Sequence, residues 1–323
     1  MRTTVSGAIG AIAMAFALAA PAQAGKSTPQ YTSLTVFGDS LVDAGNIFTL
    51  TGGRSPAASA GYFNGRWTNG YDWTDHLSLQ LFGTPTEASL RGGTNFAYGG
   101  AQAGTKSGVP DLVEQLAEYD ARRLSGLAVD PNGLYVLNFG GNDVFRAPDD
   151  ATAAEAWLRE SAATYANGIQ QLNNAGVRNL LITGYPVRGD PLSLDAEGYL
   201  TEELAKLNLA ADTTLFRFSY LDFFARVGTD PNSLGLPAQR TDITCRAAGA
   251  AAIAGGCEGI FSFDGTHPSA PVQYALYRDI ERQFDLVAGD VPEPATWGMM
   301  IVGVGAVGGG LRRRRSAVRV RYA

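Results

Sequence analysis

Cysteine and histidine are scarce in this chain of 323 residues, which contains two of each. So few of these side chains leave no Cys/His cluster of the kind that binds a structural zinc ion. The sequence also lacks the Gly-Lys-Ser/Thr loop that holds nucleotide phosphates. No residue pattern therefore indicates a metal or a cofactor, and a base that works near neutral pH has to be one of two histidines.

Charged residues are also few, at 17% of the chain, and they are unevenly distributed. The formal net charge is −6, but Arg2 and six arginines within residues 312–321 lie at the two ends. Residues 25–290 keep 18 basic and 30 acidic side chains, which gives a net charge of −12. A domain this acidic repels phosphate backbones, which argues against nucleic acid as a partner. An aromatic content of 10% together with the charged content of 17% excludes a disordered chain.

The N-terminus has the parts of a secretory signal. Arg2 precedes an apolar run from Ala8 to Ala20, and the small residues Ala22 and Ala24 fit the site that signal peptidase cleaves. We therefore expect residues 1–24 to be a signal peptide that signal peptidase removes after Ala24. A buried helix is the alternative. Cleavage at this site implies export.

The C-terminus has a short apolar stretch that stops at four arginines. Val291-Pro292-Glu293-Pro294 precedes the uncharged residues 295–311, and Arg312 begins the arginine run. Seventeen helical residues rise about 25 Å, the lower limit for a bilayer span, and six glycines weaken this stretch as a helix. The arginines would stay on the cytoplasmic side. The pattern favours a short transmembrane helix that acts as a temporary inner-membrane anchor.

The order of Pro-Glu-Pro, Trp297, apolar stretch and arginines resembles the PEP-CTERM sorting signal of Gram-negative bacteria. Gly298 follows the tryptophan where alanine is usual in that signal, which is a mild departure. The resemblance covers residues 291–315 and implies processing by an exosortase-type membrane enzyme and delivery to the cell surface or the extracellular matrix. An ordinary membrane anchor is the alternative. We assign residues 291–323 to this segment and residues 25–290 to one domain.

The two cysteines, Cys245 and Cys257, bracket a stretch that is rich in alanine and glycine. In an exported chain, two cysteines this close indicate a disulfide, because the oxidising compartment lets the bond persist. The bridge would hold a loop shortly before Asp264. Two free buried thiols are the alternative.

Apolar runs and helical patterns alternate along the middle of the chain. Four runs lack the period-two alternation of half-exposed strands, as expected for strands covered on both faces. They are residues 34–37, 134–139, 180–183 and 215–218. Helical patterns lie at residues 112–119, 154–172, 202–215 and 272–284. This alternation predicts an α/β fold with a parallel sheet, helices on both faces, and its chemistry at the carboxyl ends of the strands.

Ser40 follows the first predicted strand, in the turn Gly38-Asp39-Ser40-Leu41. The glycine permits a sharp turn, and Ser40 would then stand at a helix start whose free N–H groups stabilise negative charge. Serine and aspartate at such a turn are also ordinary helix caps. A serine nucleophile needs a base, and the candidates are His76 and His267. His76 alternates with apolar residues in a helix-like stretch, which favours a structural role.

His267 lies three residues after Asp264 and directly before a proline. The Asp-Gly turn and the proline let the two side chains meet across a short loop. Asp264 would then hold the ring through one nitrogen and leave the other to take a proton from Ser40. The alternative is a plain Asp-Gly turn that leads into a helix.

Two loops offer hydrogen-bond donors for the oxyanion of an acyl-transfer reaction. The loop 95–101 contains the adjacent Gly99 and Gly100, whose N–H groups no side chain obstructs. The loop 140–143 offers the side-chain amide of Asn142. Each loop taken alone is also typical of an ordinary turn.

In chain order, the blocks 38–41, 95–101, 140–143 and 264–267 resemble the conserved blocks of the GDSL esterase/lipase family, also called SGNH hydrolases. A further block, Gly65-Arg66-Trp67-Thr68-Asn69-Gly70, looks like the Gly-Arg-Phe-Ser-Asn-Gly stretch of larger members. The resemblance spans about residues 33 to 285. It implies a flavodoxin-like, three-layer α/β/α fold with a five-stranded parallel sheet.

Carried onto this chain, the resemblance implies Ser40 as the nucleophile, His267 as the base and Asp264 as the partner that orients the base. The implied oxyanion donors are the backbone N–H of Ser40, a backbone N–H of either Gly99 or Gly100, and the side chain of Asn142. At the catalytic positions the sequence does not depart from the family pattern.

These expectations describe an exported serine hydrolase that cleaves small-molecule, lipid or glycan esters through an acyl-enzyme on Ser40. Neither a metal nor a cofactor is required. Two alternatives remain: an O-acetylesterase that acts on envelope polysaccharide, and a catalytically silent surface or matrix protein on the same fold. An aromatic-rich stretch at residues 62–73 either edges a substrate cleft or belongs to the core.

Overall fold

Four parallel strands form the sheet at the centre of the fold. The computed structural model describes residues 31–104, 107–186 and 190–287. The strands are β1 (Leu34–Gly38), β2 (Leu134–Asn138), β3 (Asn179–Thr183) and β4 (Thr214–Phe218), and they pair in this order. Each boundary lies within one residue of a run predicted as a buried strand. The apolar runs therefore located all four strands.

A short irregular segment takes the place of a fifth strand beside β1. Backbone hydrogen bonds link residues 94–98 to β1 at three points, with N···O distances of 2.7 to 3.0 Å. Only Asn95 forms a ladder bridge there, opposite Val36. The glycine pairs Gly92-Gly93 and Gly99-Gly100 bracket the segment, and glycine weakens a strand. The described residues thus form four regular strands where the resemblance implied five.

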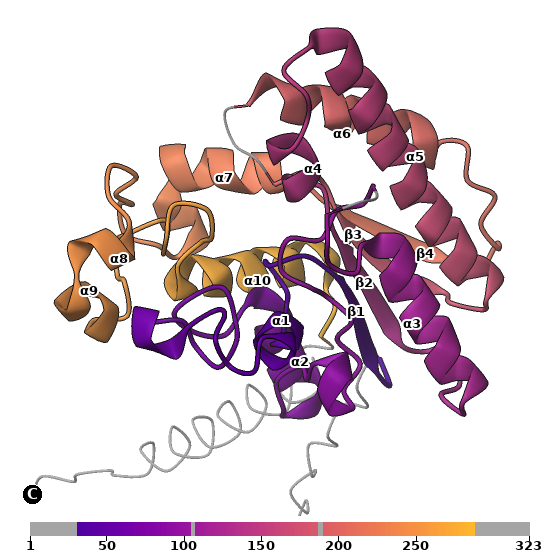
Figure 1. The fold of residues 1–323 in the computed structure, drawn as a ribbon, viewed down its shortest axis with the longest axis horizontal. Coiled ribbons are helices and arrows are strands. Elements are labelled where there is room, and N and C mark those ends of the chain that lie inside the picture. Colours follow the sequence, from indigo (N-terminus) through magenta and orange to yellow (C-terminus); the bar gives the residue numbers. More distant parts are fainter. Residues whose placement is uncertain (1–30, 105–106, 187–189, 288–323) are drawn as a thin grey trace, which may run out of the picture. The chain divides into compact units, whose positions relative to one another are not determined.

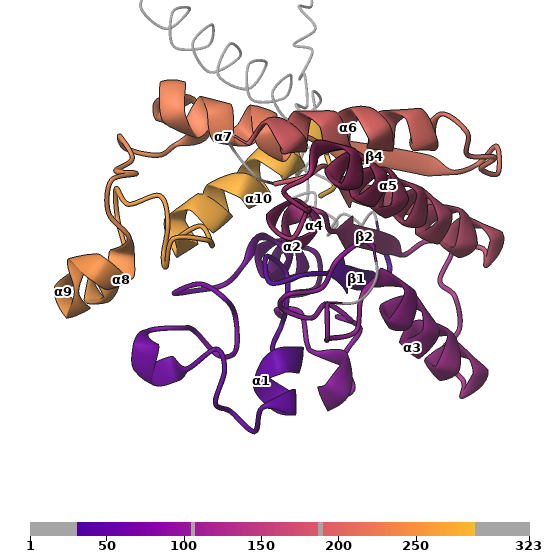
Figure 2. The ribbon, with the colours of Figure 1, turned by 45° about the horizontal axis from the view of Figure 1, so that its top comes forward.

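Helices cover both faces of the sheet and give the three-layer α/β/α architecture that the resemblance implied (Figures 1 and 2). One layer contains α2 (Trp73–Phe82), α7 (Tyr220–Thr229) and α10 (Ala270–Phe284). The other contains α3 (Leu112–Leu124), α5 (Ala151–Asn174) and α6 (Pro191–Leu204). Successive residues of one strand face opposite layers, because Val36 packs in the first core and Phe37 in the second.

The remaining helices are short and lie in the connections. They are α1 (Asn46–Leu50), α4 (Gly141–Phe145), α8 (Cys245–Ala248), α9 (Ala250–Ala254) and the 3-10 turns at Ala58–Ala60, Ser89–Arg91 and Pro231–Leu234.

The sequence pattern predicted a helix at residues 202–215, and this prediction is wrong. Helix α6 ends at Leu204, and the chain has already entered β4 at Thr214. The side chain of Asp190 caps the start of α6, with a proline in its first turn. Beyond the helix, Gln170 on α5 holds the backbone N–H and carbonyl of Asn208, with distances of 2.8 and 3.0 Å. These contacts to α5 replace the continued helix.

The segments expected to direct export lie outside the described residues. They are the signal peptide at 1–24 and the sorting segment at 291–323, with its apolar stretch 295–311. Within the described parts of the chain, no helix is long and apolar enough to cross a membrane. The described residues all fall in one compact unit.

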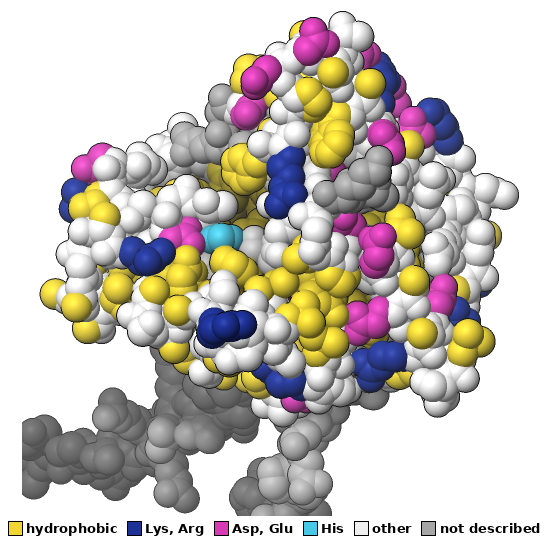
Figure 3. Space-filling view, in the orientation of Figure 1, with side chains coloured by type: hydrophobic (Ala, Val, Ile, Leu, Met, Phe, Trp, Pro, Cys, Tyr) yellow, Lys and Arg dark blue, Asp and Glu magenta, His cyan; other side chains and the backbone are white. Residues whose placement is uncertain are grey.

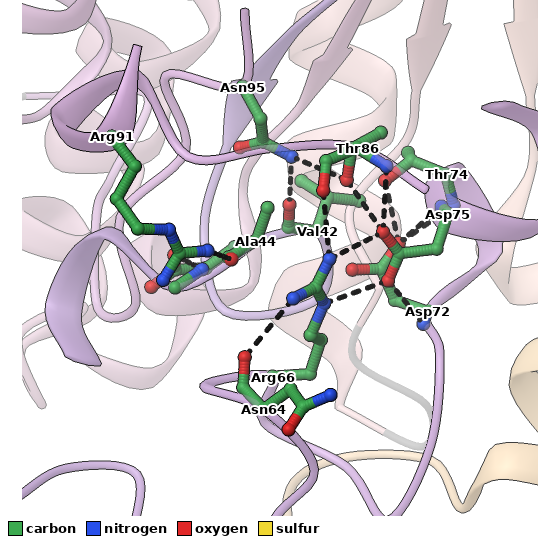
Figure 4. Close-up of polar contacts among 12 residues, drawn as sticks. Val42, Ala44, Asn64, Arg66, Asp72, Thr74, Asp75, Thr86, Arg91 and Asn95 are labelled. Carbon is green, nitrogen blue, oxygen red and sulfur yellow. Dashed lines mark hydrogen bonds and ion pairs between the residues drawn. The ribbon is translucent and has the colours of Figure 1, made fainter. Parts of the chain in front are cut away.

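A buried ion pair ties the start of α2 to the loop before it (Figure 4). The Nη2 and Nε atoms of Arg66 lie 2.8 and 2.9 Å from the two carboxylate oxygens of Asp75. The side chains are only 6% and 0% exposed. Asp75 also accepts hydrogen bonds from the N–H and hydroxyl of Thr86, whose carbonyl accepts from Arg66. Both charges are therefore paired and hydrogen-bonded, as burial requires.

Replacing Asp75 by asparagine should lower the free energy of unfolding by about 3 kcal/mol, because it leaves the buried Arg66 guanidinium without its counterion. Urea unfolding followed by far-ultraviolet circular dichroism measures the change. Asp212→Asn is the matched control, since Asp212 pairs with Arg178 but is 74% exposed. The control should cost less than about 1 kcal/mol. Equal losses in the two variants would contradict a structural role for the buried pair.

Candidate active site

A cavity of about 230 Å³ opens at the carboxyl ends of β1 and β2. Three of the predicted site residues line it: Ser40, Asn142 and His267. The rest of the wall is largely apolar, and its large side chains are Leu41, Phe145, Phe224 and Phe261. On this face of the molecule a histidine is visible beside acidic and hydrophobic side chains (Figure 3). The chemistry that the sequence placed at this edge of the sheet therefore shares one cavity.

Ser40, His267 and Asp264 form a continuous hydrogen-bonded chain. The Oγ atom of Ser40 lies 2.8 Å from Nε2 of His267, and Nδ1 of His267 lies 2.8 Å from Oδ2 of Asp264. An ionised carboxylate only accepts, so Nδ1 carries the ring proton and Nε2 is free to accept from the serine hydroxyl. This geometry prepares a serine for nucleophilic attack.

Four hydrogen-bond donors surround the carboxylate of Asp264. The Oδ1 atom accepts from the N–H groups of Thr266 at 3.0 Å and His267 at 2.9 Å. The Oδ2 atom accepts from the ring of His267 and from the hydroxyl of Tyr62, which lies at 2.6 Å. Burial raises the pKa of Asp264, but these donors outweigh it and hold the pKa well below its usual value. The carboxylate therefore stays ionised beside the ring.

Ser40 lies in a turn and not at a helix start, which corrects the expectation from sequence. Helix α1 begins only at Asn46. Asp39 holds the turn, because its Oδ1 atom accepts from the N–H of Leu41 at 3.0 Å and from the side chain of Asn138 at 3.2 Å. Burial raises the pKa of Asp39 to about 7. The turn that carries Ser40 is thus held by the side chain of Asp39, which Asn138 at the end of β2 contacts, and not by a helix.

The structure distinguishes the two glycines that the sequence left open. The Gly99 N–H donates to Oδ2 of Asp43 at 2.9 Å and is therefore engaged. In the described ranges, the N–H groups of Gly100 and Ser40 donate to no acceptor. The side chain of Asn142 donates one proton to the Ala101 carbonyl at 2.8 Å and keeps a second. Gly100 is thus the candidate donor from this loop.

Asp43 joins the glycine loop to the turn after β1, a role that the sequence analysis missed. Besides Gly99, its carboxylate accepts from the N–H groups of Gly45 and Asn46 at 2.8 and 2.7 Å. The indole N–H of Trp67 lies 3.3 Å from the same carboxylate. Burial raises the pKa of Asp43 above its usual value, although the hydrogen bonds oppose the shift. The spacing Asp43-x-Gly45-Asn46 is typical of an aspartate-capped turn and was the available signal.

The second histidine, His76, lies on α2 and takes no part in this chain of contacts. Its ring centroid lies 5.0 to 6.0 Å from those of Tyr71, Tyr274 and Tyr277. Burial lowers its pKa, which keeps the ring neutral among these aromatics. In the part of the chain that the structure covers, no group of three histidine, cysteine or acidic side chains is placed to hold a metal ion.

A disulfide joins Cys245 to Cys257 and encloses α8 and α9. The bridge packs with Ile260 and Phe263 in a small separate core. The backbone N–H of Cys245 donates to the carbonyl of Ser262 at 2.9 Å. The enclosed loop is therefore fastened to the residues directly before Asp264.

Two family models match this chain. Residues 34–280 match the one described as GDSL-like Lipase/Acylhydrolase, which covers the sheet and the whole hydrogen-bonded chain. Residues 290–315 match the PEP-CTERM protein-sorting motif.

Similar curated proteins carry lipase, hemolysin and acyltransferase names. The chain is 32% identical over 195 residues to lipase 1 of Photorhabdus luminescens and 28% identical over 165 residues to the thermolabile hemolysin of Vibrio parahaemolyticus. It is 26% identical over 227 residues to the phosphatidylcholine-sterol acyltransferase of Aeromonas hydrophila. These matches cover 55%, 49% and 66% of this chain, and 26%, 34% and 66% of the respective relatives. The chain therefore spans about a quarter to a third of the first two relatives.

Gly99→Ala should destabilise the protein, because a Cβ atom there would lie 2.4 Å from Nε1 of Trp67 and force the indole away from Asp43. We expect a loss of about 1–3 kcal/mol in unfolding free energy, measured in urea. Gly198→Ala on α6 is the control, since its Cβ would meet nothing within 4 Å. Alanine should stabilise that helix by up to about 1 kcal/mol. The packing argument fails if both variants move in the same direction.

Proposed function

Because the chain belongs to the GDSL-like lipase/acylhydrolase family, we propose that it hydrolyses carboxylic esters through an acyl-enzyme on Ser40. The observation that carries the proposal is the hydrogen-bonded chain from Ser40 through His267 to Asp264, with 2.8 Å at each step. Relatives that are named lipases and acyltransferases support an acyl-transfer reaction. The cavity beside Ser40 gives the ester a place to bind.

In the first half-reaction, the Oγ atom of Ser40 attacks the ester carbonyl carbon while Nε2 of His267 takes the hydroxyl proton. The ionised Asp264 stabilises the imidazolium that forms and keeps its ring in place. When the tetrahedral intermediate collapses, His267 returns the proton to the departing alcohol. The acyl group then remains on Ser40.

Negative charge develops on the carbonyl oxygen in this step and needs donors that are already in place. We assign this role to the N–H groups of Ser40 and Gly100 and to the side chain of Asn142. The free N–H groups at Ser40 and Gly100 support the assignment, as does the bond that orients Asn142 toward Ala101. Loss of one such donor costs about 10²–10³ in kcat.

In the second half-reaction, His267 takes a proton from water, and the resulting hydroxide attacks the acyl group on Ser40. The acid leaves and the serine recovers its proton. An alcohol in the position of water would give an acyltransferase, the name that one relative carries. The complete set of acid–base groups disfavours the alternative of a catalytically silent surface protein.

We further propose that residues 25–290 act outside the cytoplasm of a Gram-negative cell. The PEP-CTERM match at 290–315 supports export, exosortase processing and sorting to the cell surface or beyond. Cleavage of residues 1–24 by signal peptidase and transient anchoring through residues 295–311 belong to the same proposal. The disulfide between Cys245 and Cys257 fits an oxidising compartment.

Ser40→Ala should lower kcat for a short-chain nitrophenyl ester by about 10⁴-fold or more, because the nucleophile is gone. The release of nitrophenol by the purified protein measures this directly. Ser125→Ala is the matched control, since that hydroxyl is exposed and bonds only the nearby Arg122 carbonyl. It should keep wild-type activity.

The two histidines provide a second comparison. His267→Gln should lose activity as Ser40→Ala does, whereas His76→Gln on α2 should retain it. A wild-type protein with no activity across a panel of esters would favour the catalytically silent alternative instead.

The apolar wall of the cavity predicts a preference for acyl groups longer than acetyl. Each buried methylene contributes about 0.8 kcal/mol, so the two added methylenes should raise kcat/KM by up to about 15-fold from the acetyl to the butanoyl nitrophenyl ester. The side chains that would provide this contact are Leu41, Phe145, Phe224 and Phe261. Faster release of acetate, especially from acetylated polysaccharide, would support the O-acetylesterase alternative.

A further inference from the structure

Residues 62–69, which the proposed reaction does not use, run beside residues 264–270 and contact them at four points. The contacts pair Tyr62 with Asp264 (2.6 Å), Trp67 with His267 (5.4 Å between ring centroids), Thr68 with the Pro268 carbonyl (2.8 Å) and Asn69 with the Ala270 N–H (2.8 Å). Three of these four residues belong to the Gly65–Gly70 block seen in the sequence.

Tyr62 makes the most direct of these contacts. Its hydroxyl donates to Oδ2 of Asp264, the same oxygen that accepts from the ring of His267. Burial, together with the hydrogen bond to Asp264, raises the pKa of Tyr62 to about 12. The hydroxyl therefore keeps its proton and acts as a donor to the carboxylate.

Several neighbours fix the ring of Tyr62. Phe263 and Trp67 lie edge-on to it, with centroid distances of 5.0 and 6.0 Å. The guanidinium of Arg246 lies 5.4 Å from the ring centroid, and its Nη1 atom lies 3.4 Å from the hydroxyl. Arg246 directly follows the disulfide-bonded Cys245, and the backbone N–H of Arg246 donates to the Phe263 carbonyl at 3.0 Å. The hydroxyl is thus held in place from both sides.

We propose that Tyr62 is a positioning residue for the acid–base pair of Asp264 and His267. Its hydroxyl sets the orientation of the Asp264 carboxylate and limits how strongly that carboxylate binds the His267 ring. The proposal rests on the proposed function, in which this pair activates Ser40. Two donors share Oδ2, so each receives less of its charge than it would alone. Removal of the hydroxyl leaves the full acceptor strength of Oδ2 to the imidazole ring.

The charged and titratable groups around this contact come from three elements. Arg246 faces Tyr62 from the disulfide loop, and His267 faces Asp264 from its own loop. Asp43 reaches the pair indirectly, because it binds the indole of Trp67 that packs on the His267 ring. Arg246 and Asp43 remain unchanged in the variants below, so their effect is common to all of them.

The test is Tyr62→Phe in the full chain, which keeps the ring and removes only the hydroxyl. We expect kcat for a nitrophenyl ester to fall about tenfold, because the Asp264 carboxylate loses the hydrogen bond that orients it toward His267. KM should change less than twofold, because substrate binding is not affected. The acid limb of the pH–rate profile should move up by about half a pH unit, since the carboxylate now stabilises the imidazolium more strongly.

Tyr71→Phe is the matched control within the same region. Its ring packs on Phe63 and His76, with centroid distances of 5.1 and 6.0 Å, and does not touch Asp264. This variant should leave kcat and the pH profile unchanged. A tenfold fall in kcat for Tyr71→Phe, or an unshifted acid limb for Tyr62→Phe, would overturn the positioning role.

A readout that needs no activity separates this inference from the proposed function. The chain has only two histidines, so proton NMR resolves both rings, and His76→Gln assigns them. In Tyr62→Phe, the resonance of the Nδ1 proton of His267 should move downfield, because Oδ2 of Asp264 then accepts from the His267 ring alone. An unchanged resonance in Tyr62→Phe overturns the inference, whereas an inactive wild-type protein together with a shifted resonance in Tyr62→Phe overturns only the ester hydrolysis.

Discussion

One hydrogen bond brings together residues that lie 227 positions apart: Ser40 after β1 and His267 before α10. It forms only because β1 and the start of α10 meet at the same edge of the sheet. Helix α10 packs against α2, and Asn69 holds the first N–H of α10, so the loop that carries His267 has little freedom to move. The proposed chemistry depends on this placement, since proton transfer requires the two groups at hydrogen-bond distance.

Much of this arrangement is predictable from sequence, for identifiable physical reasons. Strands covered on both faces must be apolar throughout, so β1 to β4 appear as uninterrupted apolar runs. The scarcity of histidine reduces the choice of base to two residues, and the helix around His76 leaves His267. The short spacing between Asp264 and His267 makes their contact a local one, which a turn can form without help from the rest of the fold.

Contacts between distant segments were not predictable in this way. Tyr62 and Asp264 are 202 positions apart, and no periodicity links them. The choice between Gly99 and Gly100 depends on the carboxylate of Asp43, which engages one N–H and not the other. The end of α6 is likewise decided by Gln170 on another helix. In each case a tertiary partner overrides what the local sequence permits.

The strand order β1-β2-β3-β4 follows the order of the sequence. Each new strand can therefore add to an edge that is already present, because the chain is synthesised from its N-terminus. Ser40, which follows β1, is synthesised early, and His267, which precedes α10, is synthesised near the end of the domain. Ser40 thus lacks its hydrogen-bond partner His267 until nearly the whole domain has been synthesised.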